Sequence, residues 1–457
     1  MSFTTHDIFN WLDLESTFPK TDVTGVTIDS RTVRQNNLFV ALKGEHADGH
    51  AFVDQALQQG ACAALVTADY AASVPVSRRN RLIAVEDPLA GLQRMATCFR
   101  KTFSGPVIAV TGSNGKTTTK EMVSAVLAVK FHVHKTEGNL NNHIGVPMTL
   151  LSCSDKTDIM VVEMGMNHPG EIGNLCRLAE PTHGVITNVG RGHMGFFRSL
   201  EDVGKAKAEL LEFLKDSGSA FINGDDAILR KYRDVASHTQ LFGFDAQCHV
   251  RAERLESRGE FPAMRIDGTD VRLKLPGEHQ LSNALAATAV GMAMQIPLSA
   301  IARTLSELQS FPQRMEKIEV GGIQILNDVY NANPDSMMAA VKTLISMPAQ
   351  HHIAILGCMK ELGKFSVDEH SRLGEWMMSL PLDYFFGVGE DMAIAVQSIN
   401  RNGRKRGTHA LNAADVLAPV MNCIRPGDAV LVKGSRSMRM ETVVNGLIEA
   451  MKTGIQE

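Results

Sequence analysis

The chain has 457 residues, of which 44% are hydrophobic and 21% are charged, a balance typical of soluble globular proteins and unlike that of disordered or collagen-like chains. Its 46 Lys and Arg against 50 Asp and Glu give a net charge of −4, which argues against the overall positive field that nucleic acid or an anionic membrane selects. No apolar run approaches the roughly 18 residues of a membrane span, and the N-terminus has no signal-peptide pattern. The seven scattered cysteines indicate a reducing compartment. We therefore expect a cytoplasmic protein of several domains.

The first part of the chain, to about residue 87, is predicted to contain short mixed α/β segments. Residues 52–67 predict a helix, a break at Gly60 and a buried strand, and residues 89–103 predict the next helix. A strand, a glycine loop and a helix are expected over 107–129. The segments that follow are strands at 158–165, 182–190 and 219–226, with helices at 171–180 and 201–216 between them. Such alternation indicates a mostly parallel sheet covered on both faces.

A third part begins near residue 313, and it again interleaves strands with helices. Its expected strands cover 322–330, 351–357, 384–389 and 429–435. The fold class is therefore α/β with three domains, at 1–87, 88–312 and 313–457. We expect a small N-terminal α/β domain, a central parallel-sheet domain and a Rossmann-like C-terminal domain.

The sharpest local signal is a glycine loop between the apolar run VIAV and a helical pattern. This is the context in which backbone amides and a helix N-terminus bind phosphate. Lys116 can reach the β- and γ-phosphates, and the hydroxyl of Thr117 can ligate Mg²⁺. The loop is the short form G-x-x-G-K-T, because Val110 stands where the longer motif has glycine. The alternative is an ordinary glycine turn. The predicted phosphate-binding residues are Gly112, Ser113, Asn114, Gly115, Lys116, Thr117 and Thr118.

Two candidate metal ligands follow predicted strands. Glu163 ends the run IMVVE, at the strand end where ligands of parallel sheets bind, and a carboxylate there could hold Mg²⁺. His193 follows GVITNV; by itself it is as well explained as a loop histidine without a role. Lys205 and Lys207 lie about 200° apart on one predicted helix, so only one can face the site, and a solvated face is the usual role of such lysines.

An amide-rich turn, TEGNLNNHIGVP, contributes Asn139, Asn141 and Asn142. These side chains can donate and accept hydrogen bonds to a substrate, although a plain polar turn has the same composition.

Taken together, the motifs resemble the Mur ligases, ATP-dependent amino-acid or peptide ligases of bacterial cell-wall synthesis, over essentially the whole chain. The motifs are GSNGKTTT, GNLNNHIGVP, VVEMGMNHPGEI, NVGRGHMG, KAKAELL, LPGEHQLSNALAA, FPQRME, NDVYNANPDS and VLVKGSRSMRME, in family order. The resemblance is closest to the MurF branch. It implies that D-Ala-D-Ala is joined to UDP-MurNAc-tripeptide through an acyl phosphate, with the N-terminal domain holding the UDP-sugar. The Asp-Asn-Pro-Arg motif of the MurE branch is absent.

The resemblance also implies roles for individual residues. Lys116, Glu163, His193 and Lys207 are the expected catalytic residues, with two Mg²⁺ ions at Thr117, Glu163, His193 and Lys207, the lysine as a carbon dioxide-derived carbamate. The expected ATP contacts beyond the loop are Asn283, Arg314, Asp328 and Tyr330. The expected substrate contacts are Ser30, Arg31, Glu45, Asn139, Asn141, Asn142, Lys433, Ser435 and Arg436.

Each later motif also has a plainer explanation. NANPDS could simply begin a helix, with Asp335 or Ser336 as its cap. Glu361 lies in a Met-x-Glu-Leu-Gly segment without an assigned role, and Cys358 replaces the aspartate usual there. The competing functions are another ligase of the superfamily, such as a MurE-type, folylpolyglutamate or cyanophycin ligase, and a nucleotide-gated binding protein without ligase activity. We expect a monomer whose partners are small-molecule substrates.

Overall fold

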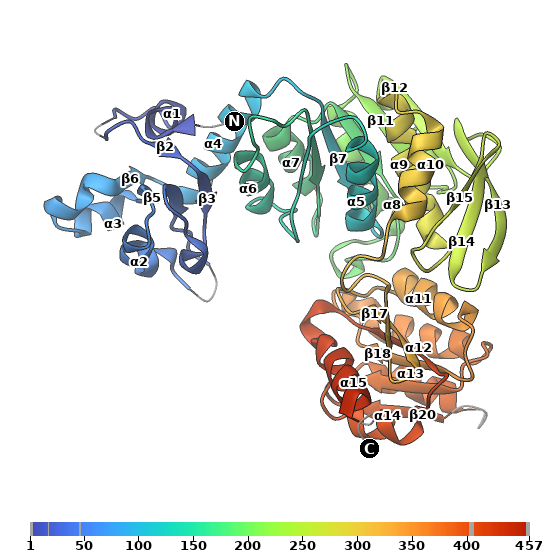
Figure 1. Cartoon of the computed structure of the whole chain (residues 1–457). Helices are drawn as coiled ribbons and strands as arrows, with labels where there is room; N and C mark the ends of the chain where they lie inside the picture. Colours follow the sequence, from blue (N-terminus) through green and yellow to red (C-terminus); the bar gives the residue numbers. More distant parts are fainter. Residues whose placement is uncertain (1–2, 17, 45–46, 402–405, 454–457) are drawn as a thin grey trace.

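The computed structural model describes residues 3–16, 18–44, 47–401 and 406–453, and it forms three α/β parts that follow one another along the chain (Figure 1). Each part has a sheet that is mainly or wholly parallel, so the predicted fold class is confirmed. No helix in these described ranges is long and apolar enough to cross a membrane.

The N-terminal part contains a parallel four-stranded sheet in the order β3-β4-β5-β6. The predicted helix, break and strand near Gly60 are confirmed, and Gly60 has the positive φ of 111° that favours glycine. Its elements are β1 (Phe3–Thr4), α1 (Thr5–Trp11), β2 (Asp22–Val23), β3 (Gly25–Thr27), β4 (Asn37–Val40), α2 (Val53–Gln58), β5 (Ala63–Thr67), α3 (Ala68–Ser73) and β6 (Leu82–Val85).

Helix α4 (Pro88–Thr102) connects this part to the centre of the molecule. Its start follows from the sequence, because the Asp87 carboxylate accepts a hydrogen bond from the backbone amide of Leu89 and Pro88 occupies the first turn. Its apolar face joins one continuous core shared by both parts, and each fully buried large side chain there contributes about 1.5–3 kcal/mol.

The central part is a nine-stranded sheet in the order β15-β14-β13-β12-β11-β10-β7-β9-β8. Its strands are β7 (Val107–Thr111), β8 (Val133–Lys135), β9 (Ile159–Glu163), β10 (His183–Ile186), β11 (Ser219–Asn223), β12 (His238–Gly243), β13 (Val250–Arg258), β14 (Phe261–Ile266) and β15 (Thr269–Arg272). Its helices are α5 (Lys116–Leu127), α6 (Gly145–Leu151), α7 (Glu171–Ala179), α8 (Leu200–Phe213), α9 (His279–Ala293) and α10 (Leu298–Glu307).

One edge of this sheet was not predicted. Strands β13, β14 and β15 extend the parallel sheet as an antiparallel meander. The turn between β14 and β15 is Asp267-Gly268, both with positive φ (44° and 78°), as a tight hairpin turn requires.

The C-terminal part is a six-stranded sheet in the order β16-β17-β21-β18-β19-β20, parallel except for its first strand. Its strands are β16 (Glu316–Val320), β17 (Ile323–Asp328), β18 (His352–Gly357), β19 (Tyr384–Val388), β20 (Arg406–Ala410) and β21 (Ala429–Lys433). Its helices are α11 (Pro334–Ser346), α12 (Ser366–Met377), α13 (Met392–Asn400), α14 (Leu417–Cys423) and α15 (Glu441–Thr453). The four strands predicted here are present.

Candidate active site

A cavity of about 770 Å³ lies between the central and C-terminal parts, a volume typical of small-molecule sites. The loop after β7 and the carboxyl end of β9 line it from one side, and the carboxyl ends of β17 and β21 line it from the other. It collects the predicted residues Ser113, Asn114, Gly115, Lys116, Thr117, Thr118, Asn141, Asn142, Glu163, His193, Asn283, Arg314, Asp328, Tyr330 and Lys433.

The phosphate loop has the predicted form, with β7 ending at Thr111 and α5 beginning at Lys116. Gly112 and Gly115 both have positive φ, 151° and 78°, and neither has room for a side chain. A Cβ would lie 1.9 Å from the Thr187 hydroxyl oxygen at the first and 2.3 Å from Asn283 Oδ1 at the second. Glycine is therefore needed at both positions, because the backbone has positive φ and because a side chain would clash with Thr187 or Asn283.

Lys116 folds back over this loop. Its Nζ donates a hydrogen bond to the Gly112 carbonyl at 2.9 Å. Burial lowers the pKa of Lys116, and the negative charge of Glu163 opposes that shift. The ammonium thus lies where a bound phosphate could replace the carbonyl as its partner.

Glu163 ends β9 and is only 2% exposed. Its Oε1 accepts a hydrogen bond from Asn141 Nδ2 at 2.7 Å, whereas its buried Oε2 has no hydrogen-bond partner among the described residues. An orphaned carboxylate oxygen beside a phosphate loop matches the oxygen ligands that Mg²⁺ prefers. The Thr117 hydroxyl, on the same cavity wall, is a compatible second donor.

His193 lies in the loop after β10 and adopts the left-handed φ of 59°. Its Nδ1 is 2.7 Å from Oε2 of Glu361, a residue of the C-terminal part. The contact lacks the alignment of a hydrogen bond, since Nδ1 has no hydrogen-bond partner in the part of the chain that the structure describes. The close contact with His193 lowers the pKa of Glu361, and partial burial opposes that shift. Glu361 therefore approaches the candidate metal ligand from the C-terminal part.

Lys207 is the buried member of the lysine pair on α8, at 2% exposure, whereas Lys205 is exposed. Within the described residues its amine has no hydrogen bond or ion pair. Burial, followed by the nearby charge of Lys116, lowers the pKa of Lys207 well below its ordinary value. A lowered pKa increases the fraction of neutral amine, which is the nucleophilic form of lysine.

Candidates for the base and ribose cluster on the C-terminal side of the cavity. The Arg314 guanidinium stacks 3.7 Å from the centre of the Tyr330 ring. Lys433 Nζ donates to Asp328 Oδ2 at 2.5 Å and to the Asn331 carbonyl at 2.9 Å. Lys433, predicted as a substrate contact, therefore lies among the nucleotide candidates.

Asn283 approaches the loop from α9 in the central part. Its Oδ1 accepts a hydrogen bond from the Thr119 hydroxyl at 3.2 Å, and its Nδ2 donates to Gln280 at 2.9 Å. His279, at the start of the same helix, is exposed at the cavity, where partial removal from bulk water lowers its pKa to about 4.

Several predicted substrate residues lie outside this cavity. Asn139 is exposed, Ser435 is buried with its hydroxyl accepting from the Lys360 amide, and Arg436 is exposed beside Glu441. Asn142 lines the cavity, but its Oδ1 accepts the amides of Ile144 and Gly145 at the start of α6.

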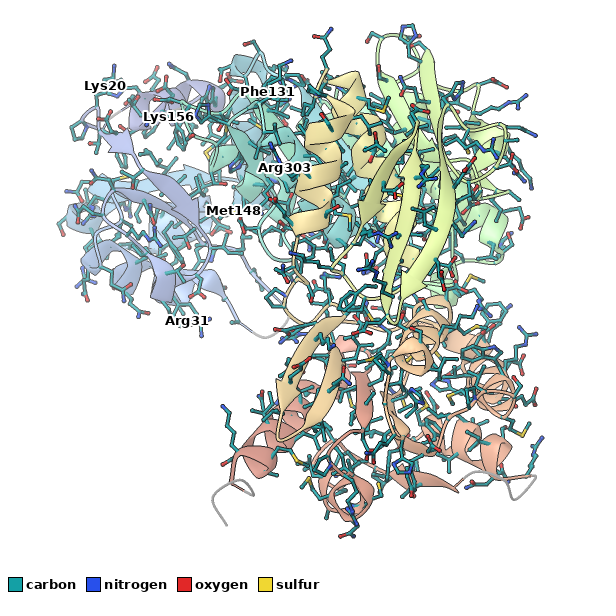
Figure 2. The ribbon with its side chains drawn as sticks, turned by 45° about the vertical axis from the view of Figure 1, so that its right-hand side comes forward. Lys20, Arg31, Phe131, Met148, Lys156 and Arg303 are labelled. Atoms are coloured by element: carbon teal, nitrogen blue, oxygen red, sulfur yellow. The ribbon has the colours of Figure 1, made fainter. Side chains whose placement is uncertain are left out.

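The N-terminal candidates lie apart from the cavity. Ser30 is buried and donates to Gln55, whereas Arg31 is 82% exposed and pairs with Asp29 on the surface of the N-terminal part (Figure 2). Glu45 lies outside the described residues.

Family models match nearly the whole chain: a Mur ligase family catalytic domain over residues 22–100, a Mur ligase middle domain over 110–291 and a Mur ligase glutamate ligase domain over 313–436. Two relatives are named UDP-N-acetylmuramoyl-tripeptide–D-alanyl-D-alanine ligase. That of Bacillus subtilis (strain 168) is 37% identical, covering 95% of each chain, and that of Escherichia coli (strain K12) is 36% identical, covering 93% of each. The chain belongs to the Mur ligase family.

Solved structures of Mur ligases have the same architecture. MurF from Acinetobacter baumannii superposes with a TM-score of 0.88 at 30% identity, covering 98% of this chain and 99% of that one. MurF ligase from Thermotoga maritima, in complex with ADP, gives a TM-score of 0.81 at 29% identity, covering 94% of this chain and 98% of that one.

The site of this Mur ligase includes residues that the sequence analysis missed. Asn188 exchanges two hydrogen bonds with the Asn114 backbone, at 2.9 and 3.0 Å. Asn333 donates to Asn114 Oδ1 at 2.7 Å from the C-terminal part. It also caps α11, so the NANPDS segment does start a helix, but its cap is Asn333 and not Asp335 or Ser336. The motifs NVGRGHMG and NANPDS contain these residues. Their contacts with Asn114 could not be read from the sequence, because they join segments more than 70 residues apart.

Cys358 is fully buried, and its thiol contacts the Val388 carbonyl. His370 and Asp391 lie nearby, but both nitrogens of His370 and a carboxylate oxygen of Asp391 have hydrogen-bond partners. These three residues therefore form a satisfied polar cluster in the core of the C-terminal part.

Proposed function

We propose that this Mur ligase uses ATP to join D-Ala-D-Ala to UDP-MurNAc-tripeptide, giving UDP-MurNAc-pentapeptide, ADP and phosphate for peptidoglycan synthesis. The observation that carries the proposal is full-length similarity to enzymes of that name, at 37% identity for the first. The site adds a physical reason, since a phosphate loop and a buried, half-satisfied carboxylate face one cavity.

In the first step, the terminal carboxylate of the tripeptide attacks the γ-phosphorus of ATP, and the bond to the ADP oxygen breaks. Both reactants are anions, so their repulsion must be neutralised where they meet. Lys116 and the loop amides are the groups of this chain placed to bind the phosphates. In the second step, the amine of D-Ala-D-Ala attacks the acyl carbon, loses a proton, and phosphate leaves as the amide forms.

Mg²⁺, when bound, would neutralise phosphate charge and fix the line of attack. Thr117, Glu163 and His193 are the residues that would hold it, with Lys207 as a carbamate. The lowered pKa of Lys207, whose amine has no hydrogen bond or ion pair among the described residues, supports that assignment, because attack on carbon dioxide requires a nitrogen lone pair. The carbamate would turn an unpaired amine into an anion beside Lys116.

The nucleotide is proposed to lie between the two parts, with Asn283, Arg314, Asp328 and Tyr330 at the base and ribose. Ser30, Arg31 and Glu45 are kept as proposed contacts to the uridine diphosphate end, and Asn139, Asn141, Asn142, Lys433, Ser435 and Arg436 as proposed contacts to the peptide and amine. We also propose the domain bounds 1–87, 88–312 and 313–457, a monomeric state, and a cytoplasmic location, where ATP is available.

Phosphate release tests the function directly, in a panel that crosses UDP-MurNAc-tripeptides, with diaminopimelate or lysine as third residue, against D-Ala-D-Ala and single amino acids. We expect phosphate and ADP only when a tripeptide nucleotide and D-Ala-D-Ala are both present, with a product of the pentapeptide mass. Release with single amino acids would instead indicate a MurE-type ligase. A correctly folded Lys116→Ala variant is the inactive control, and full activity in that variant would contradict the phosphate-loop assignment.

A further inference from the structure

Arg191, two residues before His193, connects the central part to two helices of the C-terminal part. Its Nε and Nη2 donate to Asp335 Oδ1 at 2.9 and 2.6 Å, and its backbone amide donates to Asp335 Oδ2 at 2.7 Å. Its Nη1 donates to Glu369 Oε2 at 2.8 Å. Nη2 also donates to Met338 Sδ at 3.6 Å, so one residue makes five hydrogen bonds across the interface, to α11 and to α12.

The two glycines that flank Arg191 allow this approach. A Cβ at Gly190 would lie 2.7 Å from Asp335 Oδ2, and one at Gly192 would lie 3.3 Å from Asn333 Nδ2. Only a bare backbone lets the N-terminus of α11 come this close. The loop is therefore shaped for contact with that helix.

The charges in this cluster are balanced. Arg191 is 26% exposed, and its partner Glu369 is only 8% exposed in its side chain. Arg372 binds the other oxygen of Glu369 at 3.1 Å, so two guanidinium groups face two carboxylates. Without Arg191, the buried Glu369 would keep only Arg372, and Asp335 would lose its ion-pair partner. Such a multidentate, partly buried arrangement contributes more binding energy than an isolated surface ion pair does.

The same helix end is also joined to the phosphate loop. Asn333, the cap of α11, donates to Asn114 Oδ1 at 2.7 Å. The hydroxyl of Ser113 accepts the Gly190 amide at 2.8 Å and donates to the Gly190 carbonyl at 3.1 Å. Arg191, the phosphate loop and the start of α11 thus form one connected network beside the cavity.

We propose that Arg191 is a positioning residue that clamps the C-terminal part onto the phosphate loop and so aligns the groups on the two cavity walls. The clamp acts through Asp335 and Glu369, and Arg191 itself does not touch the reacting atoms. Its effect on turnover rests on the proposed function, whereas its effect on domain closure does not.

The test combines two readouts on Arg191→Ala and Glu369→Gln: X-ray scattering of the nucleotide-free protein, and kcat with KM for each substrate. We expect both variants to be more extended than the wild type. We expect kcat to fall about 100-fold for Arg191→Ala, since misplacement of about 1 Å has effects of that size. The affinity for ADP, measured by calorimetry, should change less than about threefold, because Lys116 and the amides of the phosphate loop remain in place.

The matched control is Arg230→Ala. Arg230 is 33% exposed and pairs with Asp245 within the central part, so its loss should leave both readouts unchanged. Circular dichroism checks that each variant folds. An unchanged scattering profile overturns the clamp, and an unchanged kcat with altered scattering overturns the positioning role. Because scattering requires no substrate, a protein that fails the phosphate-release panel still tests the clamp. If Arg191→Ala does not fold, Glu369→Gln decides between these outcomes.

Discussion

Replacing Lys207 by Met should make the protein more stable and inactive at the same time. The amine is buried at 2% exposure with no hydrogen bond or ion pair among the described residues, and Met has similar length without a polar end. An unsatisfied buried polar group costs about 1–3 kcal/mol, so above about pH 10.4, where lysine is neutral in both states, its removal should return about that amount. For a domain of this size, such a gain corresponds to a melting temperature higher by roughly 2–6 °C.

The stability difference between the wild type and Lys207→Met should also depend on pH. Burial lowers the pKa of Lys207 well below its ordinary value, so the folded amine is neutral at pH values where the unfolded lysine is still protonated. Between the lowered pKa and the unfolded value near 10.4, the unfolded state binds one more proton. Wild-type stability should therefore rise with pH relative to the variant, by up to about 1.4 kcal/mol per pH unit. The advantage of Lys207→Met is largest at low pH within this window.

Calorimetry or urea unfolding, in buffer free of bicarbonate and Mg²⁺, measures the gain in stability and its pH dependence. Phosphate release measures activity. Lys205→Met on the same helix is the control, because that side chain is exposed and its loss should change neither quantity. The smaller Lys207→Ala variant should regain partial activity with short-chain carboxylic acids, which supply the missing anion. A Lys207→Met variant less stable than the wild type, or with the same pH slope, would refute the buried neutral amine.

Three further predictions concern other charged groups. Lys317→Ala should lower the free energy of unfolding in urea by about 3 kcal/mol, because Lys317 is the ion-pair partner, at 2.8 Å, of Glu260, which is 3% exposed. Substitution of the exposed Lys342 by Ala is the control, and an equal effect of both substitutions would contradict the prediction. Glu163→Gln keeps an acceptor for Asn141 but loses the charge, so kcat should fall about 10²- to 10³-fold with little change in melting temperature, and near-normal turnover would remove Glu163 from the metal site. Arg31→Ala should leave the melting temperature unchanged and raise KM for the tripeptide nucleotide on the order of tenfold, the effect of one lost charge-assisted contact; an unchanged KM would remove Arg31 from the substrate site.

The sequence by itself determined the local features of this protein. The phosphate loop from Gly112 to Thr118, the helix that starts after Asp87 and the strand that ends at Glu163 all follow from residue spacing, turn chemistry and apolar periodicity. These signals are local, because a strand or a helix start is specified by residues a few positions apart. The order of motifs also indicated the family, which the full-length similarity confirms.

Only the tertiary structure decided which side chains meet. It buried Lys207 and exposed Lys205, paired Lys433 with Asp328, and brought Glu361 to His193 and Asp335 to Arg191. It also placed Ser435 and Arg436 outside the cavity that their neighbour Lys433 lines. The partners of each pair lie about 100 residues or more apart, except for the two lysines, whose environments depend on how α8 packs. Such contacts arise when two separate sheets present their carboxyl ends to one another, and no spacing within a single segment encodes that arrangement.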